Sequence, residues 1–201
     1  MIDEFNMMIV GVGGTGVLTL SRIIGNAAVL EGLRVRIGEV HGMAQRGGSV
    51  FAEVRIGEKV YSPIIPQGRA DILLGLEPVE TLRSIYKASE RSIVVVNTHP
   101  IIPPLVSLGF AEYPSITAIL EKIKLFTSNI LACDGTEIAR QLGNPRVLNL
   151  VMLGVAFSTG KIPLSQKTIE RSIRDVIPQK YVNINIKAFR EGISEGKKLL
   201  K

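Results

Sequence analysis

A short apolar run followed by four closely spaced glycines lies near the start of this sequence and restricts the folds available to it. The run Met7 to Val10 leads into Gly11-Val12-Gly13-Gly14-Thr15-Gly16, which fits the pattern G-x-G-x-x-G. Apolar residues then recur at helical spacing up to Gly32, at Val17, Leu20, Ile24 and Ala27. The sequence therefore predicts a strand, a tight turn and a helix.

The next segment predicts strands joined by loops. Arg34 to Val40 has the composition of a strand, and His41 to Gly48 follows it as a loop. Beyond the loop, apolar residues at even positions 50 to 56 alternate with Phe51, Glu53 and Arg55, which predicts a strand whose second side faces solvent or a partner. Ile56 to Lys59 indicates a turn into Val60 and Tyr61. An ordinary dinucleotide-binding fold would place a second helix in this region.

Strands and helices alternate over the rest of the chain. Buried strands are predicted at 71–76, 93–96 and 129–133, and helices at 78–88, 116–123 and 136–142. In the helix at 78–88 the inward residues are expected to be Val79, Leu82, Ile85 and Tyr86. This rhythm is typical of an α/β fold with a parallel sheet.

The chain is expected to end in helices. Asn144-Pro145 predicts the start of a helix whose residues 147–157 are apolar on nearly every side, so that helix should be buried on several faces. Two amphipathic helices follow, one at 165–177 and one with a stripe of Ile186, Phe189, Ile193 and Leu200. Since no linker or repeat interrupts the pattern, we expect a single domain over residues 1–201. Its predicted fold is a Rossmann-like, mostly parallel sheet with an inserted strand-loop-strand region and C-terminal helices.

The glycine segment predicts an anion-binding loop. Glycine allows positive φ and close approach, so free amides at the start of the helix can point at a phosphate. The candidate cofactor-binding residues are Gly11, Gly13, Gly14, Thr15 and Gly16. The same glycines also serve close packing of a strand against a helix, which is the alternative interpretation. Glu39 lies near the end of the second strand, at about the position in the sequence where an NAD site has an acidic residue that binds a ribose hydroxyl.

A second candidate loop carries an arginine between glycines. A guanidinium in such a turn presents its planar fork to a phosphate or a carboxylate. The segment is therefore predicted to be a binding loop, and its candidate residues are His41, Met43, Gln45, Arg46, Gly47, Gly48 and Ser49. His41 has no neighbour in the sequence that would make it a metal ligand or a general base. We therefore assign no catalytic and no metal-ligating residue.

Composition excludes several classes of function. The formal charge of +6 is spread along the chain, and the four tyrosines and six phenylalanines do not interleave with it, so no nucleic-acid surface is expected. No apolar run reaches the roughly 20 residues of a membrane span, and the N-terminus has no export signal, which favours the cytoplasm. The single cysteine, Cys133, allows no internal disulfide and no cysteinyl iron-sulfur cluster, and we expect it to be a structural thiol.

Together these segments resemble the gamma-type domain of the 2-oxoacid:ferredoxin oxidoreductases. The resemblance covers almost the whole chain. It rests on the glycine segment, on the loop from Glu39 to Ser49, on Ser62-Pro63 with Ala70-Asp71, and on Leu76-Glu77-Pro78-Val79-Glu80 leading to Leu82-Arg83. The glycine pattern occurs in many families, whereas the arginine loop combined with the later segments is specific to this one.

The resemblance implies a subunit of an enzyme that oxidatively decarboxylates an arylpyruvate such as indolepyruvate. Coenzyme A is the co-substrate, and the products are an aryl-acetyl-CoA, carbon dioxide and reduced ferredoxin. In this family thiamine diphosphate, its Mg²⁺ and the iron-sulfur clusters belong to the large alpha subunit, so this chain is expected to bind no cofactor tightly and to be inactive alone. Its glycine segment and Arg46 are then expected to help bind coenzyme A phosphates or to shape the substrate pocket.

Two alternatives remain open at this point. A stand-alone NAD- or FAD-binding protein would retain its cofactor on purification. A scaffold subunit whose glycine segment only packs a helix would tolerate substitution of Gly13 or Arg46 without loss of turnover. Phenylpyruvate and hydroxyphenylpyruvate also remain possible substrates beside indolepyruvate.

Overall fold

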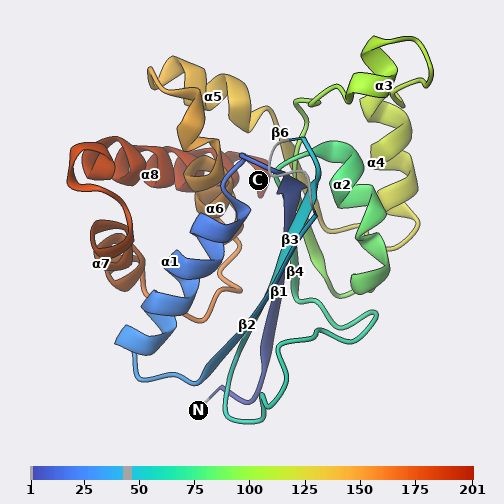
Figure 1. Ribbon diagram of the computed structural model, residues 1–201. Coiled ribbons are helices and arrows are strands. Elements are labelled where there is room, and N and C mark those ends of the chain that lie inside the picture. The colour runs from blue at the N-terminus through green and yellow to red at the C-terminus, as the bar shows by residue number, and fades with distance from the viewer. Residues whose placement is uncertain (1, 43–46) are drawn as a thin grey trace.

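The computed structural model describes residues 2–42 and 47–201, and it contains a six-stranded sheet between two layers of helices (Figure 1). The strand order across the sheet is β2-β3-β1-β4-β5-β6. The strands are β1 (Phe5–Val12), β2 (Val35–His41), β3 (Ser49–Ile56), β4 (Ile72–Gly75), β5 (Ile93–Asn97) and β6 (Ile130–Cys133). The predicted α/β fold is confirmed.

The inserted strand is β3, which lies between β1 and β2 and is antiparallel to both of them. From β1 outward, β4, β5 and β6 pair in parallel. β3 follows β2 in the sequence, and the described residues between them form no helix, in line with the predicted strand-loop-strand pattern. The register pairs Val12 at the end of β1 with Ser49 at the start of β3. This pairing brings the glycine segment next to residues 47 and 48.

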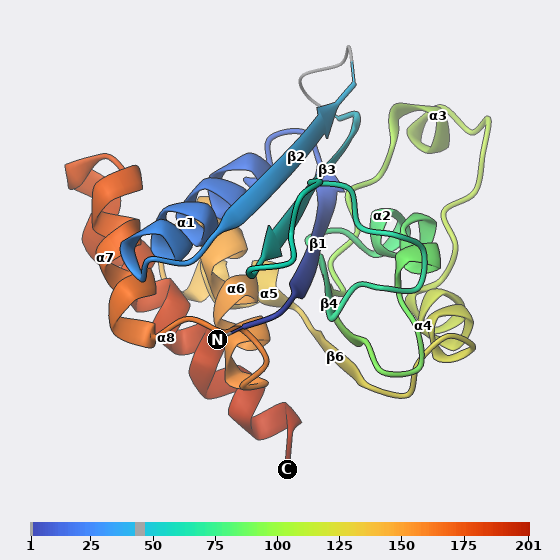
Figure 2. The ribbon, with the colours of Figure 1, turned by 90° about the horizontal axis from the view of Figure 1, so that it is seen from below.

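Helices cover both faces of the sheet (Figures 1 and 2). One face carries α1 (Val17–Leu30), α5 (Gly135–Gln141), α6 (Leu148–Ser158), α7 (Gln166–Val176) and α8 (Val182–Leu199). The other face carries α2 (Pro78–Arg83) and α4 (Ile116–Lys124), and the short α3 (Pro104–Ser107) lies in the connection between β5 and α4. Single 3₁₀ turns occur at Ile85–Lys87, Pro145–Val147 and Gln179–Tyr181. Within the described part of the chain, no helix is both long and apolar enough to span a bilayer.

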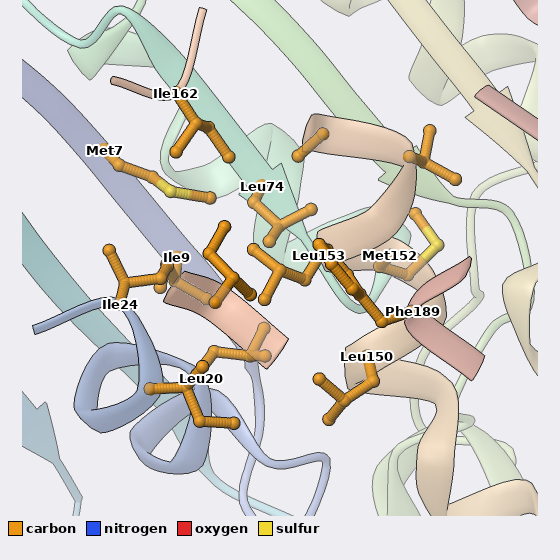
Figure 3. Packing of buried hydrophobic residues seen from close by; sticks show 14 of the residues in the cluster. Met7, Ile9, Leu20, Ile24, Leu74, Leu150, Met152, Leu153, Ile162 and Phe189 are labelled. Atoms are coloured by element: carbon orange, nitrogen blue, oxygen red, sulfur yellow. The ribbon is translucent and has the colours of Figure 1, made fainter. Parts of the chain in front are cut away.

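The larger hydrophobic core lies between the sheet and α1, α6 and α8 (Figure 3). Met7, Ile9 and Leu74 project from the strands toward Leu20 of α1 and Leu153 of α6. Every residue of α6 from Leu148 to Ala156 is buried, which confirms the prediction of a helix covered on several faces. A smaller cluster on the opposite face contains Met8, Val10, Leu73, Val94, Ile119 and Ile123.

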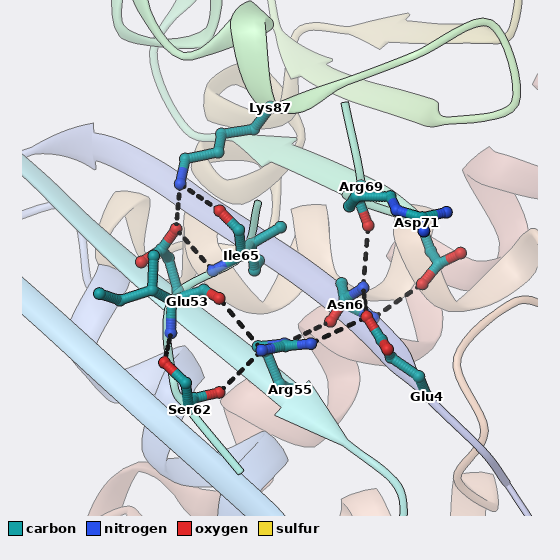
Figure 4. Close-up of polar contacts among 10 residues, drawn as sticks. Glu4, Asn6, Glu53, Arg55, Ser62, Ile65, Arg69, Asp71 and Lys87 are labelled. Atoms are coloured by element: carbon teal, nitrogen blue, oxygen red, sulfur yellow. Dashed lines mark hydrogen bonds and ion pairs between the residues drawn. The ribbon is translucent and has the colours of Figure 1, made fainter. Parts of the chain in front are cut away.

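The prediction for the second side of β3 is wrong. Glu53 and Arg55 are 6% and 7% exposed, because the connection between β3 and β4 folds over them (Figure 4). Lys87 Nζ lies 2.7 Å from Glu53 Oε1, and the amide of Ile65 donates to the same oxygen. Arg55 donates to Asn6 Oδ1 at 2.8 Å and to Glu4 Oε1 at 2.9 Å. Charges can occupy this side of the strand because each has a partner of opposite sign.

We expect Lys87→Met to lower the free energy of unfolding by about 3 kcal/mol, because it leaves the buried Glu53 carboxylate without its counter-ion. Lys59 provides a matched control, since its Nζ also lies 2.7 Å from a carboxylate, that of Asp3, but both side chains are exposed. Lys59→Met is expected to change little. Urea unfolding of the two variants measures the difference, and equal losses would contradict the role given to burial.

Three further predictions need correction. The helix expected at 78–88 ends at Arg83, and the tighter turn Ile85–Lys87 directs Lys87 toward Glu53 while leaving Tyr86 exposed. A turn does occur at Gly57, but Val60 and Tyr61 beyond it form no strand, and the carbonyls of Ser62 and Ile64 accept hydrogen bonds from Arg55. Leu200 is exposed beyond the last turn of α8.

Candidate anion-binding site

The candidate site lies where β1 ends and α1 begins, at the carboxyl edge of the parallel strands (Figure 1). Ligands bind at this edge in open α/β sheets. Gly14 and Gly16 have φ angles of +99° and +93°, which L side chains rarely adopt, and Gly16 is the residue that caps α1. Gly11 lies within β1, and a Cβ there would come within 2.7 Å of Thr15 Oγ1. The glycines are therefore needed for the turn and for close packing.

The loop amides are only partly free, which corrects the sequence-based expectation. The amide of Gly13 donates to the carbonyl of Gly48 at 2.8 Å, and that of Thr15 donates to the carbonyl of Val12 at 3.0 Å. The Thr15 hydroxyl donates to the same carbonyl. Among the described residues, no acceptor is bonded to the amides of Gly16 and Val17. These two amides at the start of α1 can therefore receive an anion.

Two pockets flank the glycine segment. One has a volume of about 400 Å³ and is lined mainly by backbone and apolar side chains, including Val12, Val17, Leu18 and Val50. The other, of about 270 Å³, is more polar and extends from Gly14, Thr15 and Gly16 to α6 and the start of α8. Together they offer room for a ligand with both a phosphate and an apolar part.

The polar pocket contains residues that sequence reasoning missed. Arg146 is exposed at its rim, and Tyr181 lines it from the start of α8. The Asn149 amide lies against the glycine turn, with Nδ2 at 3.4 Å from the carbonyl of Gly16. These residues are more than 100 positions from the glycine segment and belong to no motif, so only the packing of α6 against α1 brings them there.

The second candidate loop is described only at its ends. Gly47, Gly48 and Ser49 lie beside the glycine segment, since Gly48 accepts from the Gly13 amide. The Ser49 hydroxyl donates to Glu80 Oε2 at 2.5 Å, and Glu80 is 6% exposed. This bond fixes the start of β3 to α2. Of the other predicted residues, Met43, Gln45 and Arg46 lie outside the described residues, as does the side chain of His41, whose backbone ends β2.

The position of Glu39 argues against an NAD site. It lies on β2, and β3 separates β2 from β1, so Glu39 is two strands away from the glycine segment. Two strand spacings amount to about 10 Å, whereas the acid of a dinucleotide site stands on the adjacent strand. Glu39 instead accepts a hydrogen bond from the Ser21 hydroxyl at 2.6 Å.

The described residues include one cysteine and no cluster of metal ligands. Burial raises the pKa of the Cys133 thiol to about 12, so it is protonated at neutral pH and is a poor nucleophile and metal ligand. Within residues 2–42 and 47–201, no three His, Cys, Asp or Glu side chains lie close enough to hold a metal ion. The residues present therefore do not fit a metal centre or an iron-sulfur cluster.

Comparison with known proteins gives consistent results. Residues 6–195 match the family model described as "Pyruvate ferredoxin/flavodoxin oxidoreductase". The chain is 42% identical over 200 residues to indolepyruvate oxidoreductase subunit IorB of Pyrococcus horikoshii, with 99% of each chain covered. It is 27% identical to ketoisovalerate oxidoreductase subunit VorA of Methanothermobacter marburgensis, covering 98% of this chain and 37% of the relative.

A solved structure shares the fold. The 2-oxoglutarate:ferredoxin oxidoreductase from Magnetococcus marinus, solved with 2-oxoglutarate, coenzyme A and succinyl-CoA bound, matches with a TM-score of 0.74 and 18% sequence identity. The match covers 98% of this chain and 32% of that chain. In that protein and in the Methanothermobacter marburgensis relative, the same unit is thus part of a polypeptide about three times as long.

Proposed function

We propose that this chain, which belongs to the pyruvate ferredoxin/flavodoxin oxidoreductase family, is the small subunit of a heteromeric 2-oxoacid:ferredoxin oxidoreductase. The observation that carries this proposal is the 42% identity over 99% of both chains to a relative named indolepyruvate oxidoreductase subunit IorB. We take residues 1–201 as one gamma-type domain of a cytoplasmic enzyme.

For the substrate we propose an arylpyruvate, with indolepyruvate favoured by the name of the relative. The C–C bond between the carboxylate and the keto carbon breaks, carbon dioxide leaves, and the acyl group is joined to the coenzyme A sulfur, whose proton is released to solvent. The electron pair released in this oxidation passes to ferredoxin.

The redox groups belong, in our proposal, to the large alpha subunit. The single cysteine of this chain is protonated at neutral pH, and its described residues offer no cluster of metal ligands. An enzyme of this family therefore needs thiamine diphosphate, Mg²⁺ and iron-sulfur clusters from a second chain. This chain is expected to be inactive without that partner.

The contribution of this chain is to bind coenzyme A phosphates at the glycine segment. The amides of Gly16 and Val17 can receive a phosphate, and Arg146 at the rim of the polar pocket adds a positive charge close to them. Gly47 and Gly48, at the described end of the loop from His41 to Ser49, are hydrogen-bonded to Gly13, and we propose that this loop shapes the substrate pocket shared with the partner. All of these groups bind and orient; none of them is proposed to react.

Cofactor content tests this proposal against a stand-alone NAD- or FAD-binding protein. The chain purified alone should carry no NAD, flavin, thiamine diphosphate or iron in stoichiometric amount, as measured by absorbance, mass spectrometry and metal analysis. The complex with its large subunit should carry thiamine diphosphate and iron. Retention of NAD or flavin by the isolated chain would favour the alternative and contradict the proposal.

A further inference from the structure

A stretch of twelve residues on this chain is apolar, uncharged and exposed. Between His99 and Glu112 the sequence contains no charged side chain. Residues 101–110, here called the α3 segment, include Leu105, Leu108 and Phe110, which are 61%, 67% and 78% exposed. Helix α3 within it buries none of its residues. Exposed apolar side chains grouped in this way are typical of a protein interface.

The α3 segment is held in place although its side chains cover no core. Glu77, at 2% exposure, accepts from the Ile101 amide at one end of the segment and from the Tyr113 hydroxyl beyond the other end. Inside the segment the Phe110 amide donates to the carbonyl of Leu105 at 2.9 Å. The exposure of Leu105 and Phe110 is therefore fixed by the surrounding hydrogen bonds.

The segment lies beside the candidate site. A pocket of about 140 Å³ is lined by Ile101 and Ile102 on one side and by Val12, Gly47 and Ser49 on the other. Figure 1 shows α3 at the end of the molecule toward which the arrowhead of β1 points. A partner that completes a site at this edge therefore meets the α3 segment as well.

We propose that the α3 segment docks onto an uncharged, apolar surface of the large subunit. This inference rests on the proposed function, since it assumes that such a subunit exists. In two similar proteins the same unit is part of a chain about three times as long. In those proteins the unit is therefore accompanied by further polypeptide. A second copy of this chain is the less favoured occupant, because two molecules of formal charge +6 repel each other.

Paired substitutions test the docking. The double variant Leu105→Ser/Phe110→Ser is expected to bind the large subunit about 100-fold more weakly than the wild type, because two apolar anchors are lost. The double variant Val29→Ser/Tyr61→Ser is the matched control, since Val29 and Tyr61 are 63% and 80% exposed. The control should bind as tightly as the wild type, and circular dichroism should show both variants folded.

The outcomes separate the docking from the proposed function. If the wild type binds the large subunit and the α3 variant binds it equally well, the docking proposal is wrong and the proposed function stands. If the wild type forms no complex with the large subunit, both are wrong. If the wild type self-associates and only the α3 variant is monomeric, the occupant is a second copy and the docking onto the large subunit is contradicted.

Discussion

Replacing Gly192 with alanine is expected to destabilise the protein by about 3 kcal/mol or more. An alanine Cβ at this position in α8 would stand 1.9 Å from the carbonyl oxygen of Val151 in α6. Across the same contact, a Cβ on Gly154 would stand 2.1 Å from the carbonyl oxygen of Phe189. Because both obstacles are backbone atoms, the two helices would have to move apart, and α6 lies at the centre of the core.

Gly25→Ala is the control for this prediction. Gly25 also lies inside a helix, but its added Cβ would meet only the end of the Ile37 side chain, which can rotate away. That variant is expected to change the free energy of unfolding by less than about 1 kcal/mol, since alanine also favours the helix. Urea unfolding monitored by circular dichroism compares the two, and a Gly192→Ala variant as stable as Gly25→Ala would contradict the α6–α8 contact.

Replacing Gly16 with alanine is expected to reduce kcat/KM for coenzyme A in the assembled enzyme by about 100-fold. Gly16 has a φ of +93°, and a Cβ there would lie 2.4 Å from Asn149 Nδ2. Relief of this contact moves either the start of α1 or Asn149, and both border the polar pocket. The expected loss therefore combines backbone strain with a displaced binding amide.

Two other glycines separate these causes. Gly32 follows the C-terminal end of α1, whereas the candidate site is at the opposite end of that helix. Gly32→Ala places alanine at a φ of +72° with no atom within 4 Å, and it is expected to leave kcat/KM for coenzyme A unchanged. Gly14→Ala has equally open space at a φ of +99°, but it lies inside the loop and should give an intermediate loss. Steady-state kinetics with varied coenzyme A measures all three variants. A normal kcat/KM in Gly16→Ala would contradict the proposal that the glycine segment binds coenzyme A.

The order of elements was largely predictable because each depends on local patterns. The glycine segment after an apolar run requires a strand-turn-helix unit, and the apolar residues 147–157 require a buried helix. The insertion of β2 and β3 as a strand-loop-strand unit was also predictable from the sequence. It explains why Glu39 lies two strands away from the glycine segment.

The misjudged features depend on partners distant in the sequence. The alternation along β3 separates its core side from its polar side, but no local signal shows that the polar side is covered and that Lys87, 34 positions away, neutralises Glu53 there. Asn149 and Arg146 reach the site only through the packing of α6. The sequence also overestimates how many amides of the glycine segment are free to bind an anion. The amide of Gly13 is occupied by the carbonyl of Gly48, which comes close only because β3 inserts beside β1.

The central claim is that this chain supplies binding groups while a partner supplies the redox chemistry. The most direct measurement is arylpyruvate-dependent ferredoxin reduction with coenzyme A, using this chain and the large subunit together and each of them omitted in turn. We predict turnover only when both chains are present. Reduction of ferredoxin by this chain alone, or full activity of the large subunit without it, would contradict the claim.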